Sequence, residues 1–155
     1  MGGEAKVKIV QRNKKAFFDY EIVERMEAGL VLTGSEVKSI RDGKVAMVDA
    51  YGVIEGNEAW LCEVDIGVYP FAHARNHDPR RRRKLLLHRA EIDRLAGKIR
   101  EKGLTLVPLS LYEKRGRVKV ELALVHGKQE YDRREDVRKR EDQRDIDRAM
   151  KSRRR

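Results

Sequence analysis

Several residue types on which other protein classes depend are scarce in this chain. Its 155 residues include one cysteine, three prolines and one tryptophan. A single cysteine, Cys62, excludes a disulfide framework, and no group of Cys and His residues has the spacing of a zinc site, so we expect no structural metal. No apolar run approaches the roughly 18 residues of a membrane-spanning helix, and the N-terminus lacks the apolar core of a signal peptide. We therefore expect a cytoplasmic protein.

Positive charge is what the chain has in excess. It carries 36 Lys and Arg against 26 Asp and Glu, a formal net charge of +10. Such a surplus indicates a polyanionic partner, either nucleic acid or an anionic membrane. We disfavour the membrane because no basic amphipathic helix has a broad apolar face. The run of four arginines and one lysine at residues 80–84 is the most basic stretch of the expected domain, and on its own it is as compatible with a solvated loop as with an RNA contact.

The last 25 residues have a composition of their own. Residues 131–155 contain eleven Lys and Arg against seven Asp and Glu, an excess of four positive charges. This stretch has too few apolar residues to offset the entropy of ordering it, so we expect it to be disordered when free. Ile146, Ala149 and Met150 would share one stripe if a partner induced a helix. We expect two parts: a domain at residues 1–130 and a charged tail at residues 131–155.

Two β-hairpins are predicted in the domain. Residues 45–54 and 59–64 flank a turn that contains Gly56, and residues 104–112 and 118–125 flank a turn that contains Gly116. The second hairpin alternates apolar and polar residues from Val118 onward, so we expect one buried face and one wet face. Residues 20–32 fit a helix or a strand. We favour a strand that breaks near Ala28 and Gly29.

Two short helices are also predicted. The first covers residues 34–43, with Ser35 as N-cap and Gly43 in a left-handed conformation after the last turn. Glu36 lies near the positive end of the helix dipole and Arg41 near its negative end. The second covers residues 88–102, where apolar residues recur with helical spacing before Gly103. Together these elements indicate a mainly β fold: an oligonucleotide-binding-type antiparallel β-barrel with two or three short helices and a disordered basic tail.

Five segments occur together in an order that is specific to one family. They are EAGL at 27–30, GSEVKSIR at 34–41, DP at 78–79 followed by RKLLL at 83–87, LSLY at 109–112, and GK at 127–128 followed by DRR at 132–134. In these segments the chain resembles the small protein B family, the SsrA-binding proteins, from about Lys14 to its end. The family usually has Asp-Lys-Arg where this chain has Asp132, Arg133 and Arg134, so a contact specific for lysine would be altered here.

The resemblance implies a bacterial partner of transfer-messenger RNA. It implies a barrel that binds the tRNA-like part of that RNA and a tail that lies in the decoding centre and the empty message channel of a stalled ribosome. The free protein is expected to be a monomer. RNA-binding residues carried over from the family are Glu27, Lys38, Arg41, Arg83, Lys84, Leu86, Lys119 and Lys128. Ribosome-binding tail residues are Tyr131, Asp132, Arg133, Arg134, Ile146 and Met150.

For three of these residues we expect a specific kind of contact. Leu86 should face away from its two leucine neighbours and pack against a base, because side chains alternate along a strand. Glu27 can accept a hydrogen bond from a base amine or a 2′-hydroxyl, although a plain surface carboxylate is the default for such a residue. Lys119 lies on the expected wet face, where a phosphate contact and a role in solubility alone are both plausible.

Catalysis finds little support in the sequence. The four histidines are scattered, and neither serine of residues 34–41 has a base that the sequence places beside it. Gly127 and Lys128 lack the glycine spacing of a phosphate-binding loop, so we expect no enzyme activity and no cofactor. Two alternatives stay open: a ribosomal or initiation-type barrel protein with a basic tail, and an RNA-processing enzyme that uses His77 and Asp78.

Overall fold

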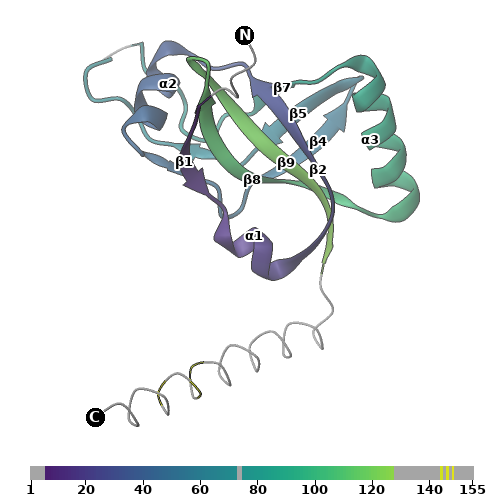
Figure 1. Cartoon of the computed structure of the whole chain (residues 1–155). Coiled ribbons are helices and arrows are strands. Elements are labelled where there is room, and N and C mark those ends of the chain that lie inside the picture. Colours follow the sequence, from purple (N-terminus) through teal and green to yellow (C-terminus); the bar gives the residue numbers. More distant parts are fainter. Residues whose placement is uncertain (1–5, 73–74, 128–143, 145, 147, 149–155) are drawn as a thin grey trace.

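The computed structural model describes residues 6–72 and 75–127, together with residues 144, 146 and 148 of the tail. Seven strands form one antiparallel sheet in the order β1-β8-β4-β5-β7-β2-β9, and β8 also pairs with β9. That last pairing closes the sheet into a barrel (Figure 1), with β1 attached to β8 outside the ring. The strands are β1 (Val7–Arg12), β2 (Tyr20–Leu30), β4 (Tyr51–Glu55), β5 (Glu58–Cys62), β7 (Arg83–Leu86), β8 (Thr105–Lys114) and β9 (Arg117–Gly127).

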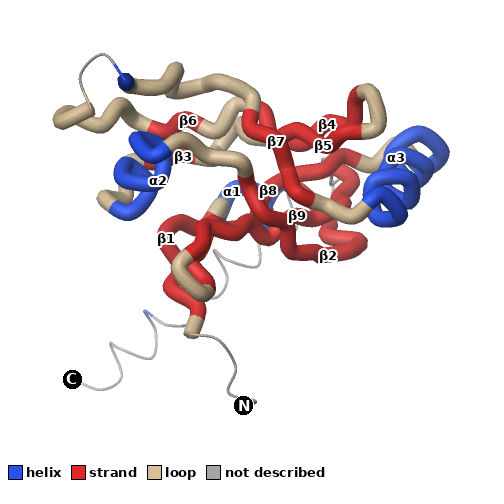
Figure 2. Tube along the Cα trace, turned by 90° about the horizontal axis from the view of Figure 1, so that it is seen from above, coloured by secondary structure: helices blue, strands red, loops and turns tan. Residues whose placement is uncertain are grey.

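The remaining elements cover the barrel and its ends. A separate two-stranded sheet pairs β3 (Val45–Ala46) with β6 (Asp65–Ile66). The helices are α1 (Lys14–Asp19), α2 (Gly34–Arg41) and α3 (Arg89–Lys102). Figures 1 and 2 place α2 and α3 at opposite ends of the molecule. The predicted class, mainly β with an antiparallel barrel and short helices, is confirmed. No helix in the described residues is long and apolar enough to cross a membrane.

The β8–β9 hairpin forms where predicted. Its turn contains Arg115 and Gly116, both with positive φ (53° and 74°), which is the backbone of a tight hairpin turn. The expectation of one wet face is wrong for the half of the hairpin that lies away from the turn. There a second apolar cluster with Ala16 of α1 covers the outer face, and Val107 and Ala123 are buried in it. The cause is α1, a helix that the sequence analysis did not predict.

The first hairpin is shorter than predicted. β4 pairs with β5 across a turn that contains Gly56 and Asn57, but residues 45–46 belong to β3 and pair with β6 instead. β2 is a strand, as favoured, yet the break expected near Ala28 and Gly29 is wrong. The register with β9 continues through both residues, and the irregularity lies between Ile22 and Glu24.

The helices α2 and α3 follow the sequence closely. Gly43 and Gly103 have φ values of 76° and 62° after their helices, as expected. The predicted N-cap of α2 is wrong by two residues: Thr33 accepts a hydrogen bond from the Glu36 amide, and the Glu36 carboxylate accepts one from the Thr33 amide. Ser35 instead contacts His77, a partner 42 residues away that no local pattern identifies.

Candidate nucleic-acid interface

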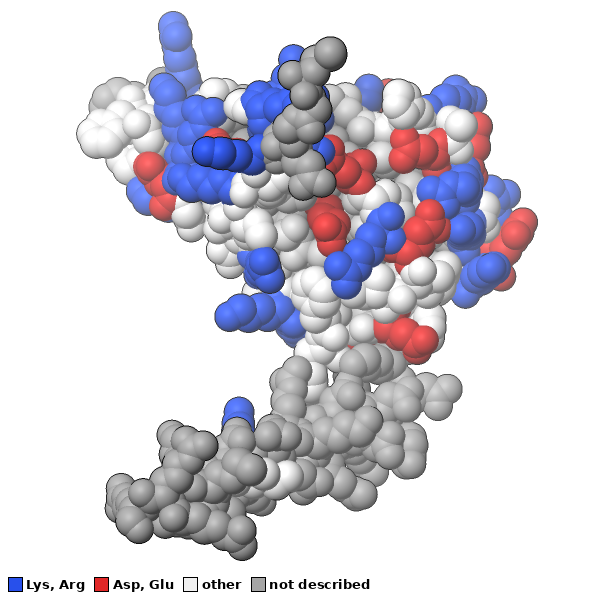
Figure 3. Space-filling view, viewed as in Figure 1, with Lys and Arg blue, Asp and Glu red and all other residues white. Residues whose placement is uncertain are grey.

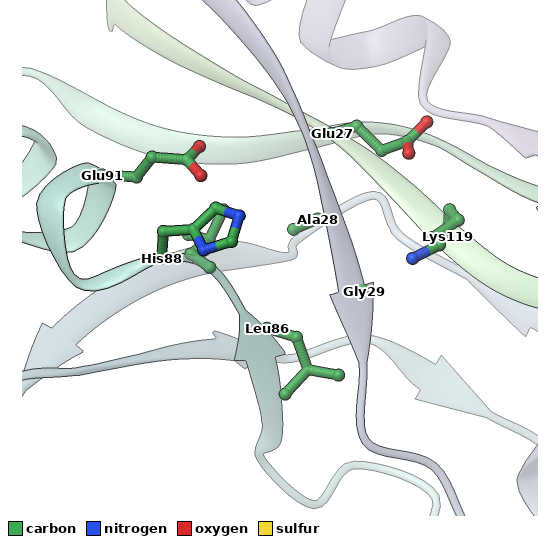
Figure 4. Close-up of a pocket in the computed structure, with 8 residues that line it drawn as sticks. Glu27, Ala28, Gly29, Leu86, His88, Glu91 and Lys119 are labelled. Atoms are coloured by element: carbon green, nitrogen blue, oxygen red, sulfur yellow. The ribbon is translucent and has the colours of Figure 1, made fainter.

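A hollow of about 410 Å³ opens where β2, β7, β9 and the start of α3 meet. We call it the β2–β7 pocket. Figure 4 shows Glu27 and Lys119 on one side of β2 in this view, and Leu86, His88 and Glu91 on the other. The pocket is lined by Glu27, Ala28, Gly29, Leu86, Leu87, His88, Glu91 and Lys119. The structure therefore brings together three predicted residues that lie far apart in the sequence.

Leu86 is the exposed apolar group of this pocket. Its side chain is 53% exposed, whereas neighbouring Leu85 is buried, which confirms the predicted alternation along β7. Gly29 pairs with Leu86 in one ladder and with Lys119 in the other. A Cβ atom at Gly29 would lie 3.2 Å from Leu86 Cδ1 and 3.5 Å from Lys119 Nζ. The glycine thus lets these two side chains approach each other across β2, a role that the sequence did not reveal.

Glu27 is held by two donors from β8. The Tyr112 hydroxyl and Lys114 Nζ, the latter at 3.3 Å, both donate to Glu27 Oε2. The hydrogen bond from Tyr112 is the main cause that lowers the pKa of Glu27 below its ordinary value, so the carboxylate stays charged. Within the described residues nothing donates to Oε1, which leaves one oxygen available to accept a hydrogen bond from a ligand.

Three cations near the β8–β9 turn have no salt bridge within residues 6–72 and 75–127: Arg115, Arg117 and Lys119. We call them the turn cations. Together with Glu27 and Lys114 they line a second hollow. A cation without a carboxylate partner can bind a phosphate without first breaking an ion pair. The resemblance pointed to Lys119 but to neither arginine: Arg115 lies in a turn that is ordinarily interpreted only for its backbone, and Arg117 is the first residue of β9.

The basic run at residues 80–84 is not a free positive surface. Each of its cations forms a salt bridge, and Arg82 also lies over the Trp60 ring, 5.0 Å from its centroid. The pairs are Arg80 with Glu63 and Asp65, Arg81 and Arg83 with Glu36, Arg82 with Glu55, and Lys84 with Glu58. The sequence left an RNA contact and a solvated loop open for this run; its geometry does not favour the RNA contact, because each of its cations is paired with a carboxylate within the fold.

Arg83 is the clearest correction. Its side chain is 1% exposed, its Nε lies 2.6 Å from Glu36 Oε2, and its Nη1 donates to the Val64 carbonyl at 2.6 Å. Burial acts to raise the pKa of Glu36, but hydrogen bonds from Arg81, the Thr33 amide and Arg83 outweigh it and hold that pKa below its ordinary value. This pair fastens α2 to β7, and Arg83 cannot reach a ligand at the surface.

Lys38 and Arg41 are also not in the pocket. Arg41 Nε lies 2.6 Å from Glu113 Oε1, and Lys38 Nζ lies 5.4 Å from the centroid of the Tyr69 ring. Both belong to α2, whose Val37 lines a neighbouring hollow with Leu86 and Lys119. Lys84 flanks Leu86 on β7 and is paired with Glu58 at 3.2 Å.

Most of the predicted tail residues lie outside the described part of the chain: Lys128, Tyr131, Asp132, Arg133, Arg134 and Met150. Ile146 is described. It has helical backbone, as do Arg144 and Arg148, and its side chain is 51% exposed. The expectation that the tail is disordered when free stays a prediction.

His77 is a structural residue. Its Nε2 lies 2.8 Å from the Ile66 carbonyl, which can only accept, so Nε2 carries the proton and Nδ1 accepts from the Ser35 hydroxyl at 2.8 Å. Asp78 accepts from the Arg80 amide rather than orienting the imidazole. Burial raises the pKa of the Cys62 thiol, which disfavours a nucleophilic thiolate. This geometry removes the basis for the enzyme that uses His77 and Asp78.

Comparison with known proteins identifies the family of this chain. A family model described as SmpB protein matches residues 10–152. The SsrA-binding protein of Corynebacterium jeikeium is 54% identical over 142 residues, 92% of this chain and 77% of the relative. That of Myxococcus xanthus is 50% identical over 153 residues, 99% of this chain and 94% of the relative.

A solved structure is similar to this chain as well. It is described as "tmRNA-SmpB: a journey to the center of the bacterial ribosome", and one of its chains is 44% identical to this one. The match has a TM-score of 0.61 and covers 83% of this chain and 87% of that chain. The fold, the family model and the relatives agree, and this chain belongs to the SmpB family of SsrA-binding proteins.

Proposed function

We propose that this protein is an RNA-binding adaptor of ribosome rescue by trans-translation. It binds the tRNA-like part of transfer-messenger RNA through its barrel and delivers that RNA to stalled ribosomes. The β2–β7 pocket carries the proposal: an exposed leucine, a carboxylate and a lysine that forms no salt bridge with any described residue meet there. The relatives are SsrA-binding proteins, and the similar solved chain belongs to a structure whose description names tmRNA and the bacterial ribosome.

Each side chain of the pocket has one task in this proposal. Leu86 packs against an unstacked base, since base recognition in RNA targets loops and ends rather than the deep groove of the duplex. Glu27 Oε1 accepts a hydrogen bond from a base amine or a 2′-hydroxyl, while Tyr112 and Lys114 hold the other oxygen. Lys119 and the other turn cations bind phosphates and displace condensed counterions.

The tail serves a different step. Residues 1–130 form the RNA-binding domain, and residues 131–155 order in the empty message channel, with Tyr131 stacking on a base of the decoding centre. Arg133 replaces the usual family lysine and keeps its charge. The protein catalyses no reaction, because its role as an adaptor is to hold two RNA-containing partners together. Its compartment is the bacterial cytoplasm, where ribosomes translate.

The RNA that co-purifies with the protein tests the proposal. We expect sequencing of that RNA to find transfer-messenger RNA, and we expect a Leu86→Ala variant to lose it. Val48→Ala is the matched control, since Val48 is similarly exposed and does not line the pocket. Recovery of ribosomal RNA alone would instead indicate a ribosomal or initiation-type protein. Cleavage of the bound RNA during incubation would contradict the adaptor role.

A further inference from the structure

The most exposed large hydrophobic side chain of the described residues is not part of the β2–β7 pocket. Phe71, in the connection between β6 and β7, is 77% exposed. Its ring packs edge-on against Tyr69, with 5.5 Å between the ring centroids. Both views in Figures 1 and 2 place this loop beside α2, at the opposite end of the molecule from α3, whose first turn lines the pocket. Nothing in the proposed pocket mechanism uses these two rings.

The base of this loop is fastened to the fold. The Asn76 side chain accepts from the Tyr69 amide at 2.8 Å and donates to the Tyr69 carbonyl at 2.7 Å. The Gly67 amide donates to the Lys44 carbonyl at 2.9 Å, and His77 is fixed through both ring nitrogens. These bonds hold Tyr69 in place, so the aromatic pair lies on a loop that is anchored to the fold.

Two lysines that form no salt bridge in the described residues lie beside this loop. Lys38 lies over the Tyr69 ring, and Lys44 contacts the start of the loop. Among the described residues neither lysine forms a salt bridge: Glu36 is committed to Arg81 and Arg83, and Asp42 pairs with neither lysine. Figure 3 shows a cluster of Lys and Arg side chains over α2, next to a region drawn white that carries no Lys, Arg, Asp or Glu. In a protein whose basic run is ion-paired, two lysines without a carboxylate partner in the described residues, close to a half-buried Tyr69 and an exposed Phe71, are a separate feature.

We propose that Tyr69, Phe71, Lys38 and Lys44 form a second RNA-binding surface, which we call the loop platform, and that its ligand is an unpaired base of ribosomal RNA with its flanking phosphates. A flat exposed ring stacks on any base, and adjacent lysines neutralise the phosphates on either side. The inference rests on the proposed function in one respect: transfer-messenger RNA occupies the pocket, so a surface outside the pocket is available to the ribosome.

The test compares two RNA partners and two substitutions of one residue. Binding of full-length protein to purified ribosomes and to transfer-messenger RNA is measured for the wild type, Phe71→Ala and Phe71→Leu. We expect both variants to bind ribosomes at least about fivefold more weakly, because stacking on one base is worth that much, and to bind transfer-messenger RNA unchanged. Lys38→Ala should weaken ribosome binding more at low salt than at high salt. Val68→Ala, an exposed apolar residue of the same loop, is the control and should bind like the wild type.

Each other outcome overturns the proposal. If Phe71→Leu binds ribosomes normally while Phe71→Ala does not, apolar bulk and not a stacking ring is required, and the partner is a protein. If both variants lose transfer-messenger RNA, the platform belongs to the same site as the pocket. If neither variant changes ribosome binding, the platform is not an interface. Failure of the wild type to bind transfer-messenger RNA would instead contradict the proposed function, and thermal unfolding of each variant checks that the fold is intact.

Discussion

Arg83 and Glu36 form a salt bridge inside the protein, with 2.6 Å between Nε and Oε2 and side chains that are 1% and 0% exposed. Glu36 also caps α2 through the Thr33 amide and binds Arg81. One carboxylate thus joins a helix terminus, a strand and the loop before it. Because each partner is buried, removing one of them leaves the other charge without compensation.

Replacing Glu36 by Gln should therefore destabilise the fold strongly. The substitution keeps the side-chain volume but leaves Arg83 buried without a counter-charge, so we expect the free energy of unfolding to fall by about 3–5 kcal/mol. Urea denaturation at neutral pH measures this change. Glu121→Gln is the control, since Glu121 makes an exposed pair with Arg25 at 3.5 Å and should change stability by less than about 1 kcal/mol. Equal losses in the two variants would contradict the assignment.

The salt dependence of RNA binding separates free cations from paired ones. Lys119→Ala should lower the slope of log K against log salt by about 0.7 to 0.9, the share of one phosphate contact. Arg82→Ala should leave the slope nearly unchanged, because Arg82 is engaged by Glu55 and Trp60. Titrations of transfer-messenger RNA at several salt concentrations measure both slopes. If Arg82→Ala reduces the slope as much as Lys119→Ala does, the basic run contacts phosphate and this prediction is wrong.

Tyr112 should set the charge of Glu27. Its hydroxyl is the main cause of the lowered pKa of Glu27, so Tyr112→Phe should raise that pKa toward its ordinary value. A carboxyl with a lowered pKa in the folded state stabilises the protein above its unfolded pKa, and that contribution is lost as pH falls through the lowered value. Tyr112→Phe should therefore be less stable than the wild type at neutral pH. The difference in the free energy of unfolding between the two proteins should shrink as the pH falls into the acid range. NMR titration of the Glu27 carboxyl measures the shift directly.

A matched control exists for that measurement. Tyr51 is an exposed tyrosine that forms no hydrogen bond with Glu27, so Tyr51→Phe should leave the pKa of Glu27 where it is in the wild type. If the pKa of Glu27 is the same in Tyr112→Phe and the wild type, Lys114 and Lys119 alone hold it down, and Tyr112 does not position the carboxylate.

Deleting the chain from Asp132 onward should separate two activities. We expect the truncated protein to bind transfer-messenger RNA nearly as well as the full chain, since every residue of the β2–β7 pocket is retained. We expect it to lose peptide tagging on stalled ribosomes, because the residues proposed to enter the message channel are gone. Both activities are measured on one preparation. Normal tagging, or loss of RNA binding together with tagging, would contradict this division of labour.

Sequence patterns predicted the secondary structure correctly wherever it depends on contacts between residues that are neighbours in the sequence. The β8–β9 hairpin, the orientation of Leu86 and the glycines that follow α2 and α3 depend on turn chemistry, on alternation along a strand and on backbone φ, all of which are properties of neighbouring residues. The motif order also identified the family from the sequence alone.

Tertiary contacts decided what each charged residue does. The sequence shows five cations at residues 80–84 but not the carboxylates that meet them, which come from α2 and from strands and loops up to 47 residues away. It shows Ser35 as a plausible cap but not His77 beside it. A cation's availability to RNA depends on whether folding brings a carboxylate within reach. The sequence therefore determined the fold class and the kind of partner. The tertiary structure decided that Lys119 lies at the pocket without a salt bridge to any described residue, whereas Arg83 is buried and paired, because ion pairing and burial are properties of distance in space.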